Sequence, residues 1–194
     1  MKDTQKIIQE IIDNIIFESK KKAFKSEEEI QGYFSGNLRY LLEDNLELIR
    51  EFPTSEKYKR AKDEILFEDA KGKHGFIDLV IKKPFFQKES FTKEIFVGIE
   101  LEYPRGAGLK NIQNFSSHLK NDLLKLKNEP ITLRYLLVFI YNDPPFDYQN
   151  VIHGLKFDDV NFAYIRLNRK EELELEEEKA VKESIIIPDN WLKV

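Results

Sequence analysis

Residues 75–81 of the chain read GFIDLVI, and residues 96–103 read FVGIELEY. Both are apolar runs with the length of a buried strand, yet they carry Asp78, Glu100 and Glu102, where a core strand normally has no charge. Side chains two positions apart in a strand share a face, so Glu100 and Glu102 project together. If the two strands pair, Asp78 joins them. Three ionised carboxylates repel one another, and a divalent cation is the simplest way to hold them together.

Two helices are predicted before these strands. Pairs of isoleucines recur every four residues and predict a helix over residues 3–24. Ser26, followed three positions later by Glu29, has the pattern of a capping box and predicts the start of a second helix. The apolar spacing predicts that this helix runs to about Glu51.

The hydrophobic period then changes from helical to alternating. Residues 64–68 and 76–82 predict the two strands of a β-hairpin around a glycine-containing turn. The next segments predict a strand at 94–103, a helix at 109–127 and a buried strand at 133–141. A strand, a helix and another strand imply a right-handed crossover, so the strands at 94–103 and 133–141 are expected to be parallel.

These segments predict an α/β fold, a mixed sheet flanked by helices. Residues 162–167 predict one more strand. The length of 194 residues fits a single domain over 1–194. We divide it into an N-terminal helix (1–25), a core (26–141) and a C-terminal extension (142–194).

Composition excludes several classes of function. The chain has no Cys, which removes disulfides, thiolate metal sites and cysteine nucleophiles. The net charge of −4 argues against a basic coat over the whole surface, but a local basic surface remains compatible with nucleic acid. The sequence shows neither a signal peptide nor an apolar run of about 18 residues, so we expect a cytoplasmic protein without a membrane partner.

The order of elements, with Asp on one strand and Glu-x-Glu on the next, resembles the PD-(D/E)XK nuclease superfamily and its restriction-endonuclease-like fold. The similarity covers roughly residues 26–141. Residues 99–105, IELEYPR, look much like the IELKYPR form of the family motif. The resemblance implies a nuclease that hydrolyses phosphodiester bonds, with DNA as the expected substrate, and that depends on Mg²⁺ or Mn²⁺. It also implies that Asp78 and Glu100 share the metal, and that the backbone carbonyl of Leu101 completes the set.

Position 102 is Glu where the family usually has Lys, although some restriction enzymes of the superfamily use Glu-x-Glu. Glu102 is then a metal ligand, or a base that orients the attacking water. The missing lysine has two candidate replacements on the following helix, Lys120 and Lys125. The superfamily often has a further acid upstream, and three residues are candidates for it: Glu64, Glu68 and Glu29.

Basic residues near these strands are expected to contact phosphates. They are Lys73, Arg105, Lys110, Lys120 and Lys125. DNA is the expected partner, and a homodimer is left open. The alternative is a non-catalytic protein of the same fold that binds nucleic acid or a protein partner, with Glu102 marking lost activity; a third hypothesis is an unrelated interaction domain. Neutralisation of the three carboxylates by lysine would favour these last two.

Overall fold

The computed structural model describes the chain in segments separated by gaps. The described residues are 4–42, 46–60, 66–82, 95–104, 111–141, 148–155, 159–167 and 185–186. Within this part of the chain, no helix is both long enough and apolar enough to cross a membrane.

The chain begins with two helices, as predicted. Helix α1 spans Thr4–Lys21, and its paired isoleucines are all buried. Helix α2 spans Glu27–Leu41 and starts at the expected cap: the backbone N–H of Glu29 donates to Oγ of Ser26 at 3.2 Å. The Glu29 carboxylate reaches back to the N–H of Lys25 at 2.6 Å, which satisfies a second donor at this helix end.

The centre of the molecule is a seven-stranded mixed sheet in the order β2-β1-β3-β4-β5-β6-β7. Strands β1, β3 and β4 are antiparallel, β4, β5 and β6 are parallel, and β7 is antiparallel to β6. The strands are β1 (Glu47–Arg60), β2 (Leu66–Glu68), β3 (Lys73–Lys82), β4 (Ile95–Glu102), β5 (Ile131–Ile140), β6 (Val160–Arg166) and β7 (Ile185–Ile186). The predicted α/β fold with a mixed, helix-flanked sheet is confirmed.

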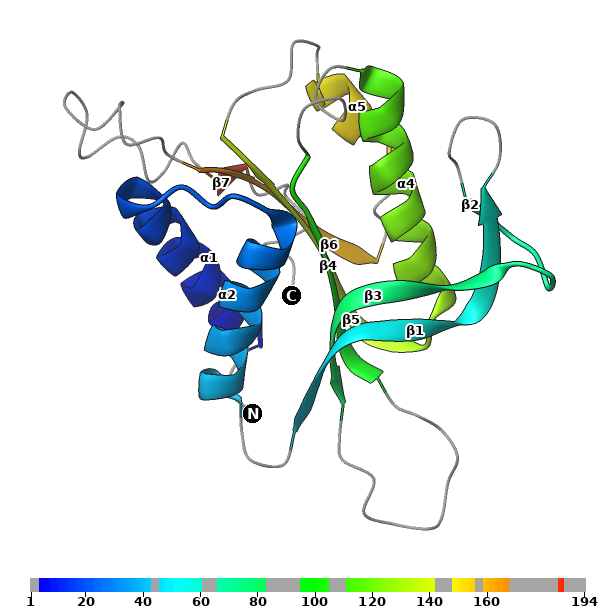
Figure 1. The fold of residues 1–194 in the computed structure, drawn as a ribbon, viewed down its shortest axis with the longest axis horizontal. Coiled ribbons are helices and arrows are strands. Elements are labelled where there is room, and N and C mark those ends of the chain that lie inside the picture. The colour runs from blue at the N-terminus through cyan, green and yellow to red at the C-terminus, as the bar shows by residue number, and fades with distance from the viewer. Residues whose placement is uncertain are drawn as a thin grey trace.

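Helices cover both faces of the sheet (Figure 1). On one face, α1 and α2 pack on alternate residues of the central strands, including Ile99 and Leu101. On the other face lie α4 (Ile112–Asn128) and the short α5 (Tyr148–Gly154). The apolar side of α4, with Leu119 and Leu123, packs on β5 and β6. The predicted parallel pairing is also confirmed, because β5 runs parallel to β4 with Val97 beside Leu133.

The prediction that the second helix continues to about Glu51 is wrong. Helix α2 ends at Leu41, and the extended strand β1 occupies Glu47–Arg60. Of this strand only Thr54 and Tyr58 are buried, so it lacks the apolar alternation that identifies a strand. It also contains Pro53, which is tolerated because the pairing with β3 becomes irregular between Pro53 and Lys57.

The predicted hairpin between residues 64–68 and 76–82 is also wrong. The short strand β2 pairs with β1, Tyr58 opposite Glu68, and lies at the edge of the sheet. The other edge of β1 pairs with β3, which therefore never contacts β2 as a ladder partner. Gly72 belongs to the turn between β2 and β3, where a Cβ would collide with the carbonyl of Tyr58, so only glycine fits this turn.

The sheet forks between β3 and β4. Their ladder ends at the pair Leu79 and Ile99. Beyond it, β3 continues along β1 through Ile77 and Phe76, whereas β4 continues along β5 through Glu102. The diverging part of β1 and β3, together with β2, forms a projection that we call the arm (residues 53–60, 66–68 and 73–77); it curves away beneath α4 (Figure 1).

Candidate functional site

The fork places Asp78 and Glu100 next to each other. Each is the first residue of its strand beyond the last ladder pair, and Oδ2 of Asp78 accepts the backbone N–H of Leu101 at 2.7 Å. The two carboxyls are close enough to influence each other's protonation. The side chain of Asp78 thus replaces a ladder bond at the point where the strands separate.

Glu102 lies on the same face of β4 as Glu100. The intervening Leu101 is packed in the core beneath α1 and α2, so the two glutamates face α4. There, Oε1 of Glu102 lies 3.4 Å from Nδ1 of His118. Glu100 is 1% exposed and Glu102 9% exposed, which is unusual for carboxylates.

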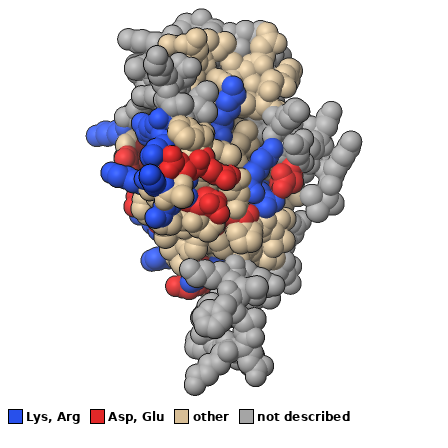
Figure 2. All heavy atoms as spheres, turned by 90° about the vertical axis from the view of Figure 1, so that its right-hand side faces the viewer, with Lys and Arg blue, Asp and Glu red and all other residues tan. Residues whose placement is uncertain are grey.

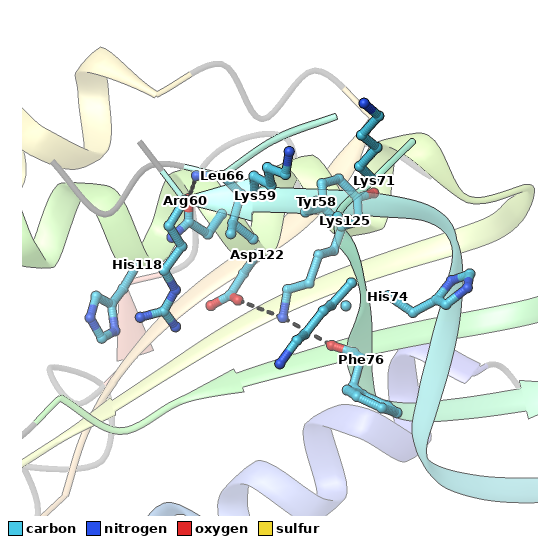
Figure 3. A pocket seen from close by; sticks show the side chains of 14 residues that line it. Tyr58, Lys59, Arg60, Leu66, Lys71, His74, Phe76, His118, Asp122 and Lys125 are labelled. Atoms are coloured by element: carbon cyan, nitrogen blue, oxygen red, sulfur yellow. Dashed lines mark hydrogen bonds and ion pairs between the residues drawn. The ribbon is translucent and has the colours of Figure 1, made fainter. Parts of the chain in front are cut away.

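Lys125 of α4 connects the two sides of the fork. Its Nζ lies 2.7 Å from Oε1 of Glu100 and 2.9 Å from Oδ1 of Asp122, and it donates to the carbonyl of Phe76 at 3.0 Å. In Figure 3, its side chain extends between Asp122 and that carbonyl. The contact with Glu100 is an ion pair rather than an aligned hydrogen bond, since Oε1 has no hydrogen-bond partner among the described residues.

Burial is the largest influence on the pKa values of the three carboxyls at the fork. Loss of solvent raises the pKa of Asp78 from 3.8 to about 6, although the Leu101 N–H and Lys125 act in the opposite direction. Burial likewise raises the pKa of Glu100 well above 4.5, and it raises that of Glu102 despite the hydrogen bond from His118. Burial opposes the charge of Lys125, but Asp122 and Glu100 outweigh it and raise the pKa of the amine.

Glu27, at the start of α2, is a further acid near these carboxylates, and the sequence analysis did not single it out. Its Oε2 accepts the N–H of Tyr103 at 3.3 Å. Burial, followed by the charges of Glu102 and Asp78, raises the pKa of Glu27 to about 7. An acid in the first turn of a helix is usually explained by the helix dipole, so the sequence offered no signal that this one faces the sheet.

The structure places the predicted upstream acids elsewhere. Glu29 is bonded to Lys22 at 2.7 Å on the surface. Glu68 lies on the edge strand β2 and accepts from Asn128. Glu64, Arg105 and Lys110 lie outside the described residues.

A second contact from α2 supports Asp78 through the backbone. Nε2 of Gln31 donates to the Asp78 carbonyl at 3.3 Å, and Arg50 of β1 donates to Oε1 of Gln31 at 2.7 Å. Glu51, the residue that would face Asp78 across β1, has φ of 50° and makes no ladder pair with it. Such a left-handed conformation is uncommon for a residue other than glycine. Gln31 therefore bonds a carbonyl at a distorted point of the sheet.

A pocket of about 650 Å³ lies between the arm and α4 (Figure 3). Lys73 and Lys125 line it, as do Asp122 and His118, which connect it to the carboxylates. Lys120 is exposed on α4 and is not one of the described residues that line it. On this side of the molecule, acidic side chains occupy the middle of the surface, with Lys and Arg on either side (Figure 2).

Among the described residues around the fork, carboxylates outnumber cations. The electrostatic neighbours are Glu27, Asp78, Glu100, Glu102 and Asp122, against Lys125 and His118. Carboxylate oxygens are the type of ligand that Mg²⁺ prefers, and the excess negative charge favours a cation. Mg²⁺ needs only one or two carboxylates in addition to water and phosphate. As the side chains stand, no three His, Asp or Glu residues in the described part of the chain are arranged to hold a metal ion. The contacting pair Asp78 and Glu100 is therefore the minimal candidate.

Comparison with known proteins gives a resemblance in fold. No family model and no curated protein matches the chain. Among solved structures, NucC of E. coli MS115-1 in its cAAA-bound form is 11% identical over 84% of this chain and 75% of that one, with a TM-score of 0.42. NucC of P. aeruginosa ATCC27853, also cAAA-bound, is 10% identical over 86% of this chain and 77% of that one, with a TM-score of 0.38. These scores describe a loose similarity.

Proposed function

We propose that this chain is a divalent-metal-dependent nuclease that hydrolyses phosphodiester bonds in DNA, using Mg²⁺ or Mn²⁺. One observation carries the proposal: at the fork, the half-buried carboxyl of Asp78 and the buried carboxyl of Glu100 come together from neighbouring strands, and Nζ of Lys125 lies 2.7 Å from Glu100. Raised carboxyl pKa values and a strained backbone, both present here, tend to concentrate at functional sites.

Asp78 and Glu100 would hold the metal, with the carbonyl of Leu101 as a further donor. Glu102 would be an additional ligand, or its carboxylate would orient the attacking water. A bound divalent ion supplies a nucleophilic water and neutralises charge on the phosphate. Glu27 adds negative charge behind Asp78 and Glu102, which favours a cation at the fork.

Lys125 takes the place of the lysine that position 102 lacks. Its amine is held at Glu100 by Asp122 and by the Phe76 carbonyl, so it stays charged beside the carboxylates. A fixed ammonium at this point stabilises negative charge that develops on the reacting phosphate. Lys120, the other candidate, points to solvent and has no such role.

The test is cleavage of plasmid DNA with Mg²⁺, Mn²⁺ or EDTA. We expect cleavage with either metal and none with EDTA. Asp78→Asn and Glu100→Gln remove the charge at nearly constant shape and should each lower the rate by at least about 100-fold, because ligand loss removes the metal's contribution. Glu10→Gln, on the exposed surface of α1, is the matched control. Cleavage that survives both site variants would place the chemistry elsewhere.

A second candidate is a non-catalytic protein of this fold that binds nucleic acid or a protein partner. The observation in its favour is that Lys125 already neutralises Glu100 and Asp122, as in a structural ion pair. In that case the chain binds no Mn²⁺ in calorimetry, and wild type and Asp78→Asn are equally inert towards DNA. Mn²⁺ binding that Asp78→Asn abolishes would exclude this candidate.

A further inference from the structure

The arm has two faces, and the pairing of its strands shows which of them is turned to α4. Tyr58 is 5% exposed, and Nδ2 of Asn128 on α4 donates to its hydroxyl at 3.4 Å. Lys73 lies opposite Tyr58 in the ladder between β1 and β3, and Arg60 follows Tyr58 by two positions on β1. Residues that are paired across a ladder, or that are two apart along a strand, share a face. Arg60 and Lys73 therefore project from the face of Tyr58 into the pocket between the arm and α4.

Hydrogen bonds from α4 hold the arm at the point where Arg60 leaves it. Leu66 of β2 is the ladder partner of Arg60, and its backbone N–H donates to Oδ1 of Asn121 at 2.8 Å. Further along the same helix, Nδ2 of Asn128 donates to Oε1 of Glu68 at 2.7 Å. The backbone of Arg60 is therefore tied to the helix that forms the other wall of the pocket.

Arg60 and Lys73 are cations without a counter-charge in the described part of the chain. Both are exposed, and neither makes an ion pair with another described residue. The one acid among the described residues that line the pocket, Asp122, is already paired with Lys125 at 2.9 Å. The pocket is therefore locally positive, although the whole chain has a net charge of −4.

Arg60 extends towards the carboxylates of the fork. In Figure 3, its side chain points to the end of the pocket where His118 and Asp122 lie. Nδ1 of His118 is 3.4 Å from Oε1 of Glu102, so this end of the pocket adjoins the fork. The excess of carboxylates there repels a phosphate that is not bound through a metal ion. Unpaired cations beside the fork offset that repulsion, and a guanidinium can bind two oxygens of one phosphate at once.

We propose that Arg60 and Lys73 form a phosphate site that needs no metal and that holds the DNA backbone next to the phosphate at the fork. Arg60 binds two oxygens of one phosphate, and Lys73 places a point charge beside a neighbouring one. The choice of DNA rests on the proposed nuclease function, which the inference deepens by naming how the strand is held. Phosphate contacts carry no sequence information, so this site fixes the position of the DNA without selecting its sequence.

Binding is measured by fluorescence anisotropy in EDTA, with a labelled duplex oligodeoxynucleotide at a series of salt concentrations. Arg60→Gln with Lys73→Gln should weaken binding roughly tenfold and reduce the slope of log K against log salt by about 1.8, the value for two phosphates of B-DNA. Lys6→Gln with Arg39→Gln, exposed on the helices of the opposite face of the sheet, removes the same charge and should change neither. Equal behaviour of the two double variants would overturn the proposal.

Arg60→Lys separates the guanidinium from its charge. This variant should keep the salt slope but bind about threefold more weakly, because an ammonium is a point charge and cannot bind two oxygens in one plane. Wild-type affinity in Arg60→Lys would overturn the two-oxygen contact. The substituted side chains are exposed, so the thermal midpoint should stay unchanged in every variant.

Cleavage assays with Mg²⁺ give a second readout. Arg60→Gln should raise KM and leave kcat nearly unchanged, whereas Asp78→Asn should lower kcat. The anisotropy assay contains no metal, so its result is independent of cleavage. Binding that depends on Arg60 and Lys73 in a protein that cuts no DNA would support the phosphate site and contradict the nuclease function. Cleavage whose KM does not respond to Arg60→Gln would retain the nuclease function and remove the phosphate site.

Discussion

Nζ of Lys125 lies 2.7 Å from Oε1 of Glu100, so a lysine from α4 stands beside the β4 carboxylate although position 102 is Glu. The amine arrives from a segment 25 positions after Glu100 in the chain. It is positioned by Asp122, one helical turn earlier, and by the carbonyl of Phe76.

Lys125→Gln should abolish cleavage and destabilise the fold. The substitution leaves Glu100 and Asp122 buried without a counter-charge, and loss of one partner of a buried pair typically costs about 3–5 kcal/mol. Urea denaturation measures the free energy of unfolding, and plasmid cleavage measures activity. Lys120→Gln, on the same helix but exposed, is the control and should leave both unchanged. If the two variants behave alike, Lys125 has neither role.

Glu102→Lys should lower metal affinity and cleavage. The amine at the fork is already supplied by Lys125, so a second one adds repulsion and removes a carboxylate. Calorimetry with Mn²⁺ and cleavage assays measure the effect, and Glu102→Gln separates the loss of the carboxylate from the added charge. A gain of cleavage in the lysine variant would instead identify the wild-type site as decayed.

Without metal, stability should fall as pH rises from 5 to 7. Folding raises the pKa of Asp78 to about 6 and that of Glu27 to about 7, so over this range the folded state binds more protons than the unfolded state. The stabilisation from these two carboxyls is fully present below their unfolded pKa values. It is lost as the pH rises through their folded pKa values. For Asp78 alone it amounts to about 3 kcal/mol. Thermal melts in EDTA measure the trend; Asp78→Asn should flatten it, and Glu29→Gln should not.

Glu27→Gln and Glu29→Gln should separate function from capping. Glu27 faces the fork, so its substitution should reduce cleavage roughly tenfold and weaken Mn²⁺ binding, with little loss of stability because burial of its charge is unfavourable. Glu29 caps α2 from the surface, so its substitution should cost about 0.5–1 kcal/mol and leave cleavage intact. The reverse pattern would assign the upstream role to Glu29.

The sequence predicted the parts of the molecule whose apolar periodicity is strong. Helix α1, the cap of α2, helix α4 and the parallel pair β4 and β5 all follow from burial on one or both faces. Strand β1 was not predicted. It is mostly exposed and contains Pro53, so neither an alternation of apolar residues nor a strand-like composition identifies it. Because β1 was not predicted, β2 was wrongly paired with β3 in a hairpin.

The site was predictable only where its residues lie on core strands. Asp78, Glu100 and Glu102 attract notice because charge interrupts an apolar run. Glu27 and Asp122 lie on helices that carry many acids, where a carboxylate that faces the sheet looks the same as one that faces water. Lys125 was one of two candidates, and only packing distinguishes it from Lys120.

Beyond the fork, side-chain hydrogen bonds join the arm to the body of the molecule, including Ser55 to Glu129 and Asn128 to Glu68. Beyond Leu79 the arm has no ladder to β4, and polar contacts replace it, among them Asp78 to Leu101 and Lys125 to Phe76. Both pass through charged groups of the site, so protonation of Asp78 alters the stiffness of the joint as well as the chemistry. Hydrogen exchange at the backbone amides of residues 73–77 therefore reports the charge state of the site. The exchange should become faster when either Asp78 or Lys125 is neutralised.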